Sequence, residues 1–567
     1  MLSSYMTYKL LSEIPGALVP FKAYRAPDAQ VIYVSNKCRL CTRDLIDGYA
    51  FSTSVQDRSN ETRTFLAERY GGAGILTNGG GARCGVDPSG IQIKGVGRNP
   101  LIGKESQRGY RSGGLTLVDA LKEVVWGEIL SHVLPHGSIT TLAVIRFIPQ
   151  TSKKKSQSDI SSQAIALRPV SLRPAHFCSA PFFLPLAKHN KQLLHDSDRV
   201  MGAVSYFPQA LSLSLGSHRP DASINQHMLN IVIRWAEQLG AARALRIMHG
   251  GLSASNICLD GRWIDYGSVS HLPSFINTKN IRPNFWSDSS ALFSVVSELS
   301  FHIFDAFKIK IDTKELFNAF NCAVDGIFKI KLVELLGLLN SDYLRDIELA
   351  REVGELSNHL ARLAKTLTES SYADDLDELL SHKSMRFVHA LLYALASTKE
   401  CNQNFDFLFP FFCRKSLVNF IDSFHTVYRL IYARYYGPAG VSITDYRRFW
   451  LLIILRAYSF NINLFEPNLI NILSSQIEKH EHRLEDISNF INRFVETQKE
   501  RLNLPLLFKV RLGWIKNEQW SFDARNGIFE IAQSSKTQYM KWEDAIKIGL
   551  LSSFSLGVEQ TLLGALL

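Results

Sequence analysis

The stretch at 249–267 reads HGGLSASNICLDGRWIDYG and carries two side chains suited to a metal ion. Asn256 and Asp265 offer an amide oxygen and a carboxylate on either side of the turn dipeptide Asp260–Gly261. Short apolar runs around such a turn predict a hairpin with polar residues at its edges. Hard oxygen ligands suit Mg²⁺. We therefore expect Asn256 and Asp265 to bind magnesium, or manganese; an ordinary hairpin that contains an Asp would also explain this stretch alone.

A glycine-rich run lies upstream, where residues 78–85 read NGGGARCG. Glycine has no Cβ, so its backbone N–H group can approach phosphate oxygens closely, and arginine adds positive charge. We assign nucleotide binding to Gly79, Gly80, Gly81 and Arg83. A glycine-rich surface turn is the alternative for this run by itself.

Lys94 follows at the end of the strand-like run IQIK and is placed to hold phosphates, provided that a partner keeps it in position. The helical segment that starts near Leu115 offers Glu123 and Glu128 as ion-pair partners. They lie about 140° apart around a helix, so only one of them should face the lysine. Solvated surface charges are the alternative for both glutamates.

The elements that must position these residues follow from periodicity. GIQIKGVG alternates like a half-buried strand, LTLVDALKEVVWGEILSHVL has helical spacing, and ITTLAVIRFI is rich in β-branched residues. From about 220 to 500 the pattern is largely helical, and it is interrupted by the hairpin at 249–267. After Pro505, two strand-like runs around Asn526–Gly527 precede a final helix.

A small β-rich lobe before a large helical lobe is the plan of a protein kinase, with the nucleotide between the lobes. We therefore predict an α+β, protein-kinase-like two-lobed fold with a C-terminal α/β appendage. Residues 1–60 are expected to form an N-terminal extension that packs on the small lobe, and residues 61–175 the N-lobe. Residues 176–504 should form the mainly helical C-lobe with the hairpin, and residues 505–567 a strand-turn-strand-helix module.

Composition narrows the class of partner. The net charge of +10 over 567 residues is moderate, and the densest basic run, Lys153–Lys155, sits in a polar segment that we interpret as a solvated loop, so we do not expect nucleic-acid binding. Cys38 and Cys41 form one Cys-x-x-Cys pair, but the sequence has no second pair at the spacing of zinc ligands. A structural zinc site needs four ligands, so we expect reduced thiols instead. Without a signal peptide or an apolar run of about 18 residues, we expect a cytoplasmic protein with no membrane span.

Several of these motifs, in this order, resemble the SelO-type pseudokinase-like protein adenylyltransferases over roughly residues 65–270. The matching stretches are IQIKGVGRNP, ITTLAVI, LRPVSLRPAHF and, without a gap, HGGLSASNICLDGRWIDYG. The resemblance implies a kinase-like fold in which ATP lies inverted, so that AMP moves to a Ser, Thr or Tyr hydroxyl of a protein. It favours Glu123 over Glu128 as the partner of Lys94. It also implies that Arg168 and Arg173 contact the nucleotide, across the cleft from Asn256 and Asp265.

The chain departs from this family where transfer chemistry is concerned. Ser255 stands at the position of the family's Asp, and a serine hydroxyl is a poor base at neutral pH and a poor metal ligand. GGGAR replaces the family's Gly-Asp-Gly-Arg. Ser255 is expected on a polar, hydrated hairpin edge. The chain thus matches the family's nucleotide-binding residues better than it matches the family's catalytic residue, which is replaced by Ser255.

A divergent branch, which the family resemblance links to siderophore-microcin maturation (MchC-like proteins), is similar in its opening EIPGALVPF and its longer C-terminus. It implies an ATP-using protein that acts on a bacteriocin peptide with an acyltransferase-like partner. Three functions remain open at this point: such a maturation protein, a protein adenylyltransferase, and a catalytically inactive nucleotide-binding scaffold.

Overall fold

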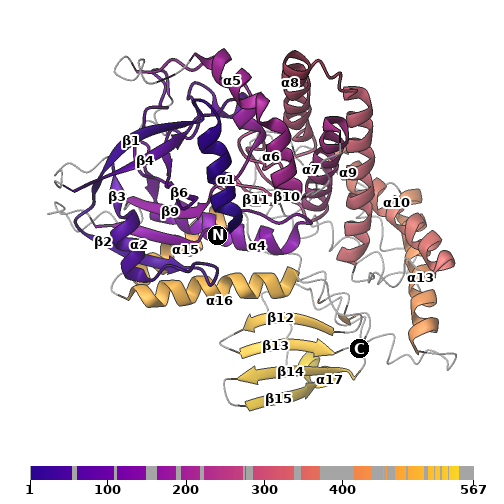
Figure 1. Ribbon diagram of the computed structural model, residues 1–567. Coiled ribbons are helices and arrows are strands. Elements are labelled where there is room, and N and C mark those ends of the chain that lie inside the picture. The colour runs from indigo at the N-terminus through magenta and orange to yellow at the C-terminus, as the bar shows by residue number, and fades with distance from the viewer. Residues whose placement is uncertain are drawn as a thin grey trace.

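Among the residues that the structure describes, nine strands form one antiparallel sheet, in the order β2-β8-β9-β6-β5-β4-β1-β3, with β7 paired to β9 (Figure 1). The strands are β1 (Leu18–Arg25), β2 (Ala29–Val34), β3 (Phe51–Ser52), β4 (Thr62–Glu68), β5 (Cys84–Val86), β6 (Ile91–Lys94), β7 (Leu115–Thr116), β8 (Ala143–Phe147) and β9 (Gln163–Pro169). The strands predicted at 90–97 and 139–148 are therefore confirmed as β6 and β8.

The computed structural model describes residues 2–53, 61–106, 112–148, 163–186, 193, 195–216, 223–272, 275, 285–336, 346–370, 414–436, 448, 451–452, 455, 466–480, 483–502, 509–515, 518–523, 526–533 and 536–547. The basic run Lys153–Lys155 lies outside these residues.

Residues 1–60 were predicted as an extension that packs on the small lobe, but their described part contributes the strands β1, β2 and β3 to the sheet itself. β1 pairs with β4 from Leu18↔Glu68 to Tyr24↔Thr62, and β2 pairs with β8. The reason is visible in β1, where Val19, Phe21 and Ala23 are buried at alternate positions. This period of two is that of a half-buried strand. The helix α1 (Leu2–Glu13) precedes β1, and α2 (Thr42–Tyr49) follows β2.

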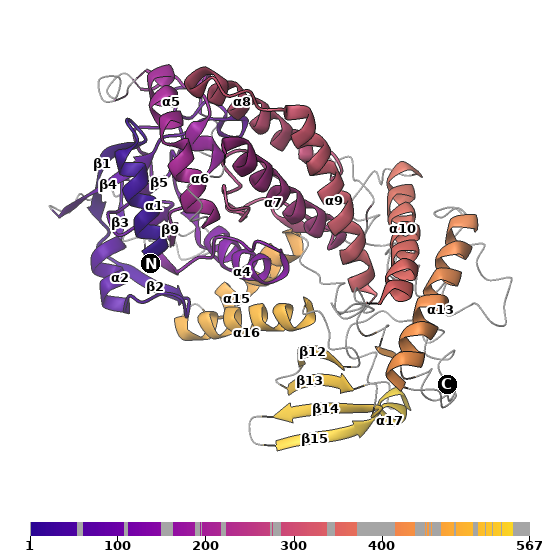
Figure 2. The same cartoon turned by 45° about the vertical axis from the view of Figure 1, so that its right-hand side comes forward.

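The predicted helix with both candidate glutamates is α4 (Leu117–Val133). Its N-cap is Thr116, whose hydroxyl accepts a hydrogen bond from the Asp119 N–H at 3.1 Å. α4 is apolar on most sides because it packs on β9, β8 and β7 and also on two later helices, α15 (Glu466–Lys479) and α16 (Leu484–Leu502). α15 and α16 thus lie against α4 of the sheet part, not in the helical lobe that was predicted over 176–504 (Figures 1 and 2).

The helical part packs beside the sheet (Figure 2). Its helices are α5 (Asp196–Ser205), α6 (Phe207–Leu215), α7 (Ile224–Ala244), α8 (Ser289–Phe307), α9 (Thr313–Leu335), α10 (Ile347–Ser370) and α13 (Arg414–Tyr436). The most extensive helix pairing is α7 with α9. Between α7 and α8, the short strands β10 (Ile247–Met248) and β11 (Ser270–His271) pair and enclose the stretch that carries the candidate metal ligands.

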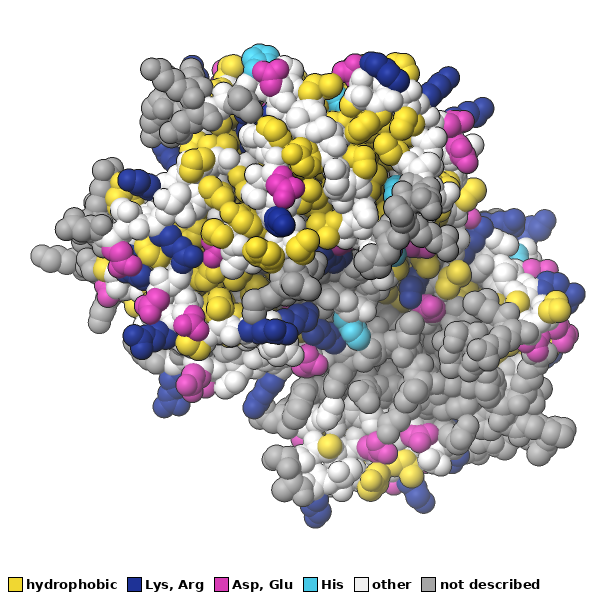
Figure 3. Space-filling model, in the orientation of Figure 1, with side chains coloured by type: hydrophobic (Ala, Val, Ile, Leu, Met, Phe, Trp, Pro, Cys, Tyr) yellow, Lys and Arg dark blue, Asp and Glu magenta, His cyan; other side chains and the backbone are white. Residues whose placement is uncertain are grey.

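Among the described helices, α8 is the one long and apolar enough to cross a membrane by length and composition. It packs against α5, α9 and the 3₁₀ helix η3 (Pro174–Phe177), and leaves Phe301 and Phe304 exposed. Apolar side chains are visible across the face that carries α1, α6 and α8 (Figure 3). The arrangement is compatible with a soluble protein.

The C-terminal module has four antiparallel strands where two were predicted, and the predicted final helix follows them. Its elements are β12 (Lys509–Ile515), β13 (Glu518–Asp523), β14 (Ile528–Gln533), β15 (Lys536–Lys541) and α17 (Trp542–Lys547). The turn at Asn526–Gly527 is confirmed, with Gly527 at φ +65°. β15, KTQYMK, is almost entirely exposed and so lacks the apolar alternation by which strands are recognised.

Candidate functional site

β6 places Lys94 on the face of the sheet that α4 covers. Successive residues of a strand point to opposite faces, so Ile91 and Ile93 pack in one apolar cluster while Gln92 and Lys94 point the other way. The Lys94 side chain is 1% exposed. A lysine this deeply buried requires compensating charge.

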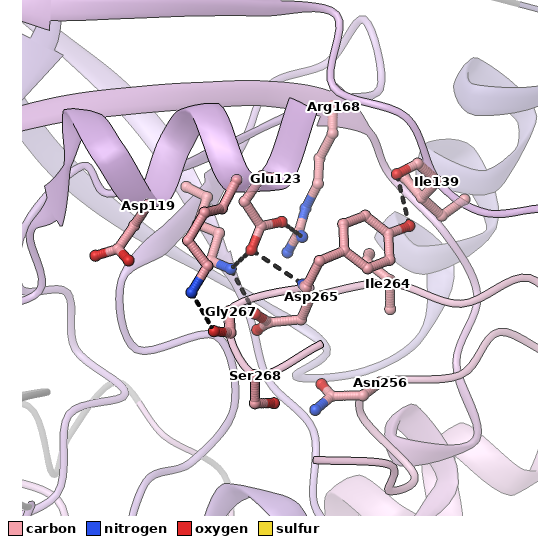
Figure 4. Close-up of polar contacts among 12 residues, drawn as sticks. Asp119, Glu123, Ile139, Arg168, Asn256, Ile264, Asp265, Gly267 and Ser268 are labelled. Atoms are coloured by element: carbon pink, nitrogen blue, oxygen red, sulfur yellow. Dashed lines mark hydrogen bonds and ion pairs between the residues drawn. The ribbon is translucent and has the colours of Figure 1, made fainter. Parts of the chain in front are cut away.

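Glu123 supplies that charge. Its Oε1 lies 2.7 Å from Lys94 Nζ, so the predicted pairing is confirmed (Figure 4). Glu128 faces another direction and lies 3.2 Å from the ammonium of Lys37 and 2.9 Å from that of Lys499. The helical geometry that separates the two glutamates explains why only one reaches the lysine.

Asp265 is the second carboxylate at Lys94, with Oδ1 2.6 Å from Nζ. The backbone N–H of Tyr266 donates to Glu123 Oε1 at 3.1 Å, which ties this segment to α4 (Figure 4). Asp265 itself has φ +69°, a conformation that residues other than glycine adopt rarely and mostly at special sites. Lys94 therefore bridges the helix and the stretch after the hairpin.

The predicted hairpin is present but short. Ile257 and Trp263 form an isolated antiparallel bridge, and the N–H of Cys258 donates to the Arg262 carbonyl at 2.8 Å. Gly261 occupies the turn at φ +95°, which glycine adopts without strain.

The electrostatics of Asp265 follow from its neighbours. Burial raises the pKa of its carboxyl, but Lys94, then Arg83 and Arg168, outweigh that effect and hold the pKa well below its usual range. Asp265 is therefore an anion at neutral pH. Its side chain is 33% exposed, whereas Glu123 is 2% exposed. Asp265 is thus the carboxylate that can also meet a ligand.

Asn256 lies in the same part of the site as Asp265 (Figure 4). Its amide nitrogen donates to the Gly251 carbonyl at 2.6 Å, and its amide oxygen accepts from the Ser255 hydroxyl at 3.2 Å. No group of three or more His, Cys, Asp or Glu that could hold a metal occurs among the described residues. A metal here would have two protein oxygen donors, which fits an ion that takes its other ligands from phosphate and water.

Arg168 and Arg173 do not line an opposite wall, as the resemblance implied, but lie inside a buried network. Arg168 Nε donates to Gln92 at 2.6 Å, and its NH1 lies 3.5 Å from Glu123. Arg173 donates to Glu68 at 2.9 Å and to the Ser255 carbonyl at 3.2 Å. Each guanidinium has a partner in the protein because an unpaired buried charge is very costly.

Gln92 and Glu68 complete this network and were not identified from the sequence. The Gln92 amide donates to Glu68, so hydrogen bonds run from Glu123 through Arg168, Gln92, Glu68 and Arg173 to the Ser255 carbonyl. Burial raises the pKa of Glu68, but Arg173 and His176 outweigh it and the pKa is lowered. The position of Gln92 two residues before Lys94, on the same face of a strand, was an available signal.

Gly79, Gly80 and Gly81 have packing and hydrogen-bonding roles within the protein, so their presence is explained without phosphate binding. The N–H groups of Gly79 and Gly81 donate to the carbonyls of Leu101 and Glu68, both at 2.9 Å. A Cβ on Gly80, at φ +137°, would collide with the Glu68 carbonyl. Arg83 remains a candidate, because its charge lowers the pKa of Asp265.

A different glycine run, at 71–74, contacts the predicted catalytic position. A Cβ on Gly74 would collide with the Ser253 side chain and lie 3.1 Å from the Ser255 hydroxyl. A Cβ on Gly72, at φ +92°, would lie 2.9 Å from Ala254. Ser255 is therefore buried, at 7% exposure, and not on a hydrated edge as expected. The sequence signal, GGAG, was available but indistinguishable from other glycine-rich turns.

His249 has a structural role at the start of this stretch. Its Nε2 lies 3.2 Å from the Ile264 carbonyl, and its ring packs edge-on against Trp263. Burial lowers the pKa of His249 and outweighs the opposite effects of this hydrogen bond and of Asp265 and Glu123. His249 thus holds the segment before Asp265 as a neutral side chain.

The site joins a sheet lysine, a helix glutamate and an aspartate that is partly open to solvent. No protein-family model matches this chain, and no curated protein matches it.

Proposed function

We propose that this chain binds ATP together with Mg²⁺ or Mn²⁺ at Lys94, Glu123 and Asp265. The observation that carries the proposal is the position of the Lys94 ammonium, 2.7 Å from Glu123 and 2.6 Å from Asp265. A lysine held by a helix glutamate is the arrangement that orients phosphates in kinases, where an aspartate and an asparagine hold the metal. Asp265 and Asn256 would hold the metal here, and the metal would neutralise phosphate charge.

A kinase-like arrangement of two lobes is the fold that goes with this function. The sheet with α4 would form the small lobe and the helices from α5 to α10 the large one, with the nucleotide between them. The placement of Lys94 on the sheet and of Asp265 beside the helical part supports this interpretation. Arg83 would add a positive charge at the phosphates.

We expect binding without efficient group transfer by this chain alone. Ser255 is buried beneath residues 71–74. The nearby carboxylates of Glu68, Glu123 and Asp265 are all in ion pairs with basic side chains. None of these carboxylates is thus available as a base for a protein hydroxyl. This favours a nucleotide-binding protein over an adenylyltransferase.

The resemblance extends the proposal to a cellular role. A SelO-like protein of this kind would act in siderophore-microcin maturation, with a peptide substrate and an acyltransferase-like partner that contributes the reactive groups. It would work in the cytoplasm.

Calorimetry with ATP and Mg²⁺ tests the binding. Asp265→Ala should lose most of the affinity, because the metal loses its carboxylate ligand, while Asp198→Ala on the exposed surface of α5 should bind as the unchanged protein does. Equal affinity in Asp265→Ala would refute the metal site. Incubation with labelled ATP tests the chemistry: α-phosphate label retained on protein means AMP transfer, and γ-phosphate label retained means kinase activity. We expect neither label to be retained.

A further inference from the structure

We propose that the chain has a second ligand site, for a small molecule with one anionic group on an apolar body, at the end of α4 remote from its N-cap. A cavity of about 550 Å³ lies there. It is bounded by the start of α1, the loop after β2, the end of α4 with the loop that follows, and the turn of the hairpin. Cavities of roughly 300–1,000 Å³ are typical of small-molecule sites.

The cavity has an apolar part and a basic part. Leu40, Ile91, Leu134 and Leu142 contribute apolar surface. Apart from the Cys38 thiol, the ionisable side chains on its wall are all basic: Lys37, Arg39, His136 and Arg262. No acidic residue is among the described residues that line it. An amphiphilic anion matches both parts.

Ion pairs around the cavity leave positive charge in excess. Glu128 is the one carboxylate within ion-pair distance of both Lys37 and Lys499, at 3.2 and 2.9 Å. Lys499 also lies 3.4 Å from Glu496, so these two lysines are matched by two carboxylates. Arg39 is exposed and has no ion-pair partner in the described part of the chain. A cluster of Lys and Arg side chains is visible on this face, between the N-terminus and α16 (Figure 3).

The other two basic side chains are already neutralised. Arg262 lies 2.6 Å from Asp260, and His136 lies 2.6 Å from Glu237. The excess charge therefore resides at Arg39, at one end of the cavity. This arrangement favours a ligand with a single carboxylate, sulfonate or phosphate over a polyanion. Arginine recognises such groups through several N–H donors at once.

The cavity wall is connected to the first site by backbone hydrogen bonds. Ser138 forms a parallel bridge with Trp263, and the Ile139 N–H donates to the Trp263 carbonyl at 2.9 Å. The same α4 helix carries Glu123 in its N-terminal half. A ligand in the cavity thus touches both elements that place Glu123 and Asp265. Coupling of the two sites rests on the proposed function; binding in the cavity does not.

Cys38 lines the cavity and provides a site-specific reporter. Native protein is treated with iodoacetate or iodoacetamide, and alkylation of each cysteine is followed by mass spectrometry of its peptide. The iodoacetate rate divided by the iodoacetamide rate should be several-fold higher at Cys38 than at Cys322, an exposed cysteine on α9. The reason is that positive potential attracts iodoacetate, which is an anion, and not the neutral iodoacetamide. Arg39→Gln should lower the ratio at Cys38. Equal ratios at the two cysteines would contradict an electropositive cavity.

1-Naphthalenesulfonate is the probe for binding, since it combines an aromatic body with one anion. We expect saturable binding by calorimetry and slower alkylation of Cys38 but not of Cys322. Ser131→Trp, which fills the cavity from the last turn of α4, should weaken binding at least tenfold. Lys22→Gln, an exposed basic position on β1, should leave binding unchanged. Absence of saturable binding, or full binding by Ser131→Trp, would overturn the site.

ATP calorimetry with and without saturating probe tests the coupling. A change of threefold or more in the ATP dissociation constant supports it, and an unchanged constant refutes it. If ATP does not bind without the probe, the proposed function fails, while the alkylation and probe results still decide the second site.

Discussion

Lys94 and Asp265 are separated by 171 positions in the chain, and their side chains meet at 2.6 Å. Glu123 approaches the same ammonium at 2.7 Å from α4. One buried cation therefore joins the sheet, the helix and the stretch after the hairpin. Stability and ligand binding should both depend on it.

Replacing Lys94 by Met should destabilise the protein by about 3–5 kcal/mol, because removal of one partner leaves a buried charge uncompensated. It should also abolish ATP binding. Urea unfolding and calorimetry measure the two effects. Lys22→Met, on an exposed position of β1, should change the free energy of unfolding by less than about 0.5 kcal/mol. The double variant Lys94→Met/Glu123→Gln should be more stable than Lys94→Met. If it is not, the two residues are not coupled.

Gly74→Ala should disturb the segment that covers Ser255, because the added Cβ collides with the Ser253 side chain. We expect a loss of about 1–3 kcal/mol in the free energy of unfolding, typical of overpacking. Ser253→Gly should restore part of it in the double variant, since it removes the colliding atoms.

Gly326 and Gly354 are matched controls, because nothing lies within 4 Å of a Cβ built on either. They lie in α9 and α10, where alanine is favoured over glycine by about 0.5–1 kcal/mol. Gly326→Ala and Gly354→Ala should therefore stabilise the protein. A Gly74→Ala protein as stable as these would show that residues 71–74 do not pack on Ser253.

Ser255→Asp should not create an adenylyltransferase. The Ser255 hydroxyl donates to the Asn256 amide oxygen, whose amide nitrogen is already bound to the Gly251 carbonyl. A carboxylate at position 255 would face the Asn256 amide oxygen, so two hydrogen-bond acceptors would meet in a buried site. This should lower the free energy of unfolding by about 1–3 kcal/mol. Retention of α-phosphate label on protein is the readout, with Ser255→Ala as the control. A rise of about 10²-fold, the lower range for a general base, would contradict this expectation.

Stability should fall between pH 7.5 and 5.5. Burial lowers the pKa of His249 and of His176 from the ordinary value of 6.5. The unfolded chain then binds more protons than the folded one below that pH, so acidification favours unfolding, by at most about 1.4 kcal/mol per pH unit for each histidine. His249→Asn should reduce this pH dependence in urea unfolding. His195→Asn, at an exposed position, should leave it unchanged; an identical slope in both variants would assign the effect elsewhere.

Local patterns identified Lys94, Asp265 and two candidate glutamates for the first site. The period of two in IQIK and the helical spacing after Leu115 predict which side chains share a face, and the meeting of Lys94 with Glu123 follows from a strand packed on a helix. The turn at Asp260–Gly261 predicts the hairpin before Asp265. The resemblance added the choice of Glu123 over Glu128.

Only the tertiary structure decided which of the candidate site residues are buried and which groups they contact. GGG at 79–81 and GGAG at 71–74 look alike in sequence, yet the first packs on its own sheet and the second covers Ser255. Arg168 and Arg173 are paired by Gln92 and Glu68, which only the neighbouring strands bring within reach. The strand at 29–34 pairs with β8, and the paired residues Ala29 and Phe147 are 118 positions apart in the chain. Such contacts depend on long-range packing, which periodicity within a short window does not encode.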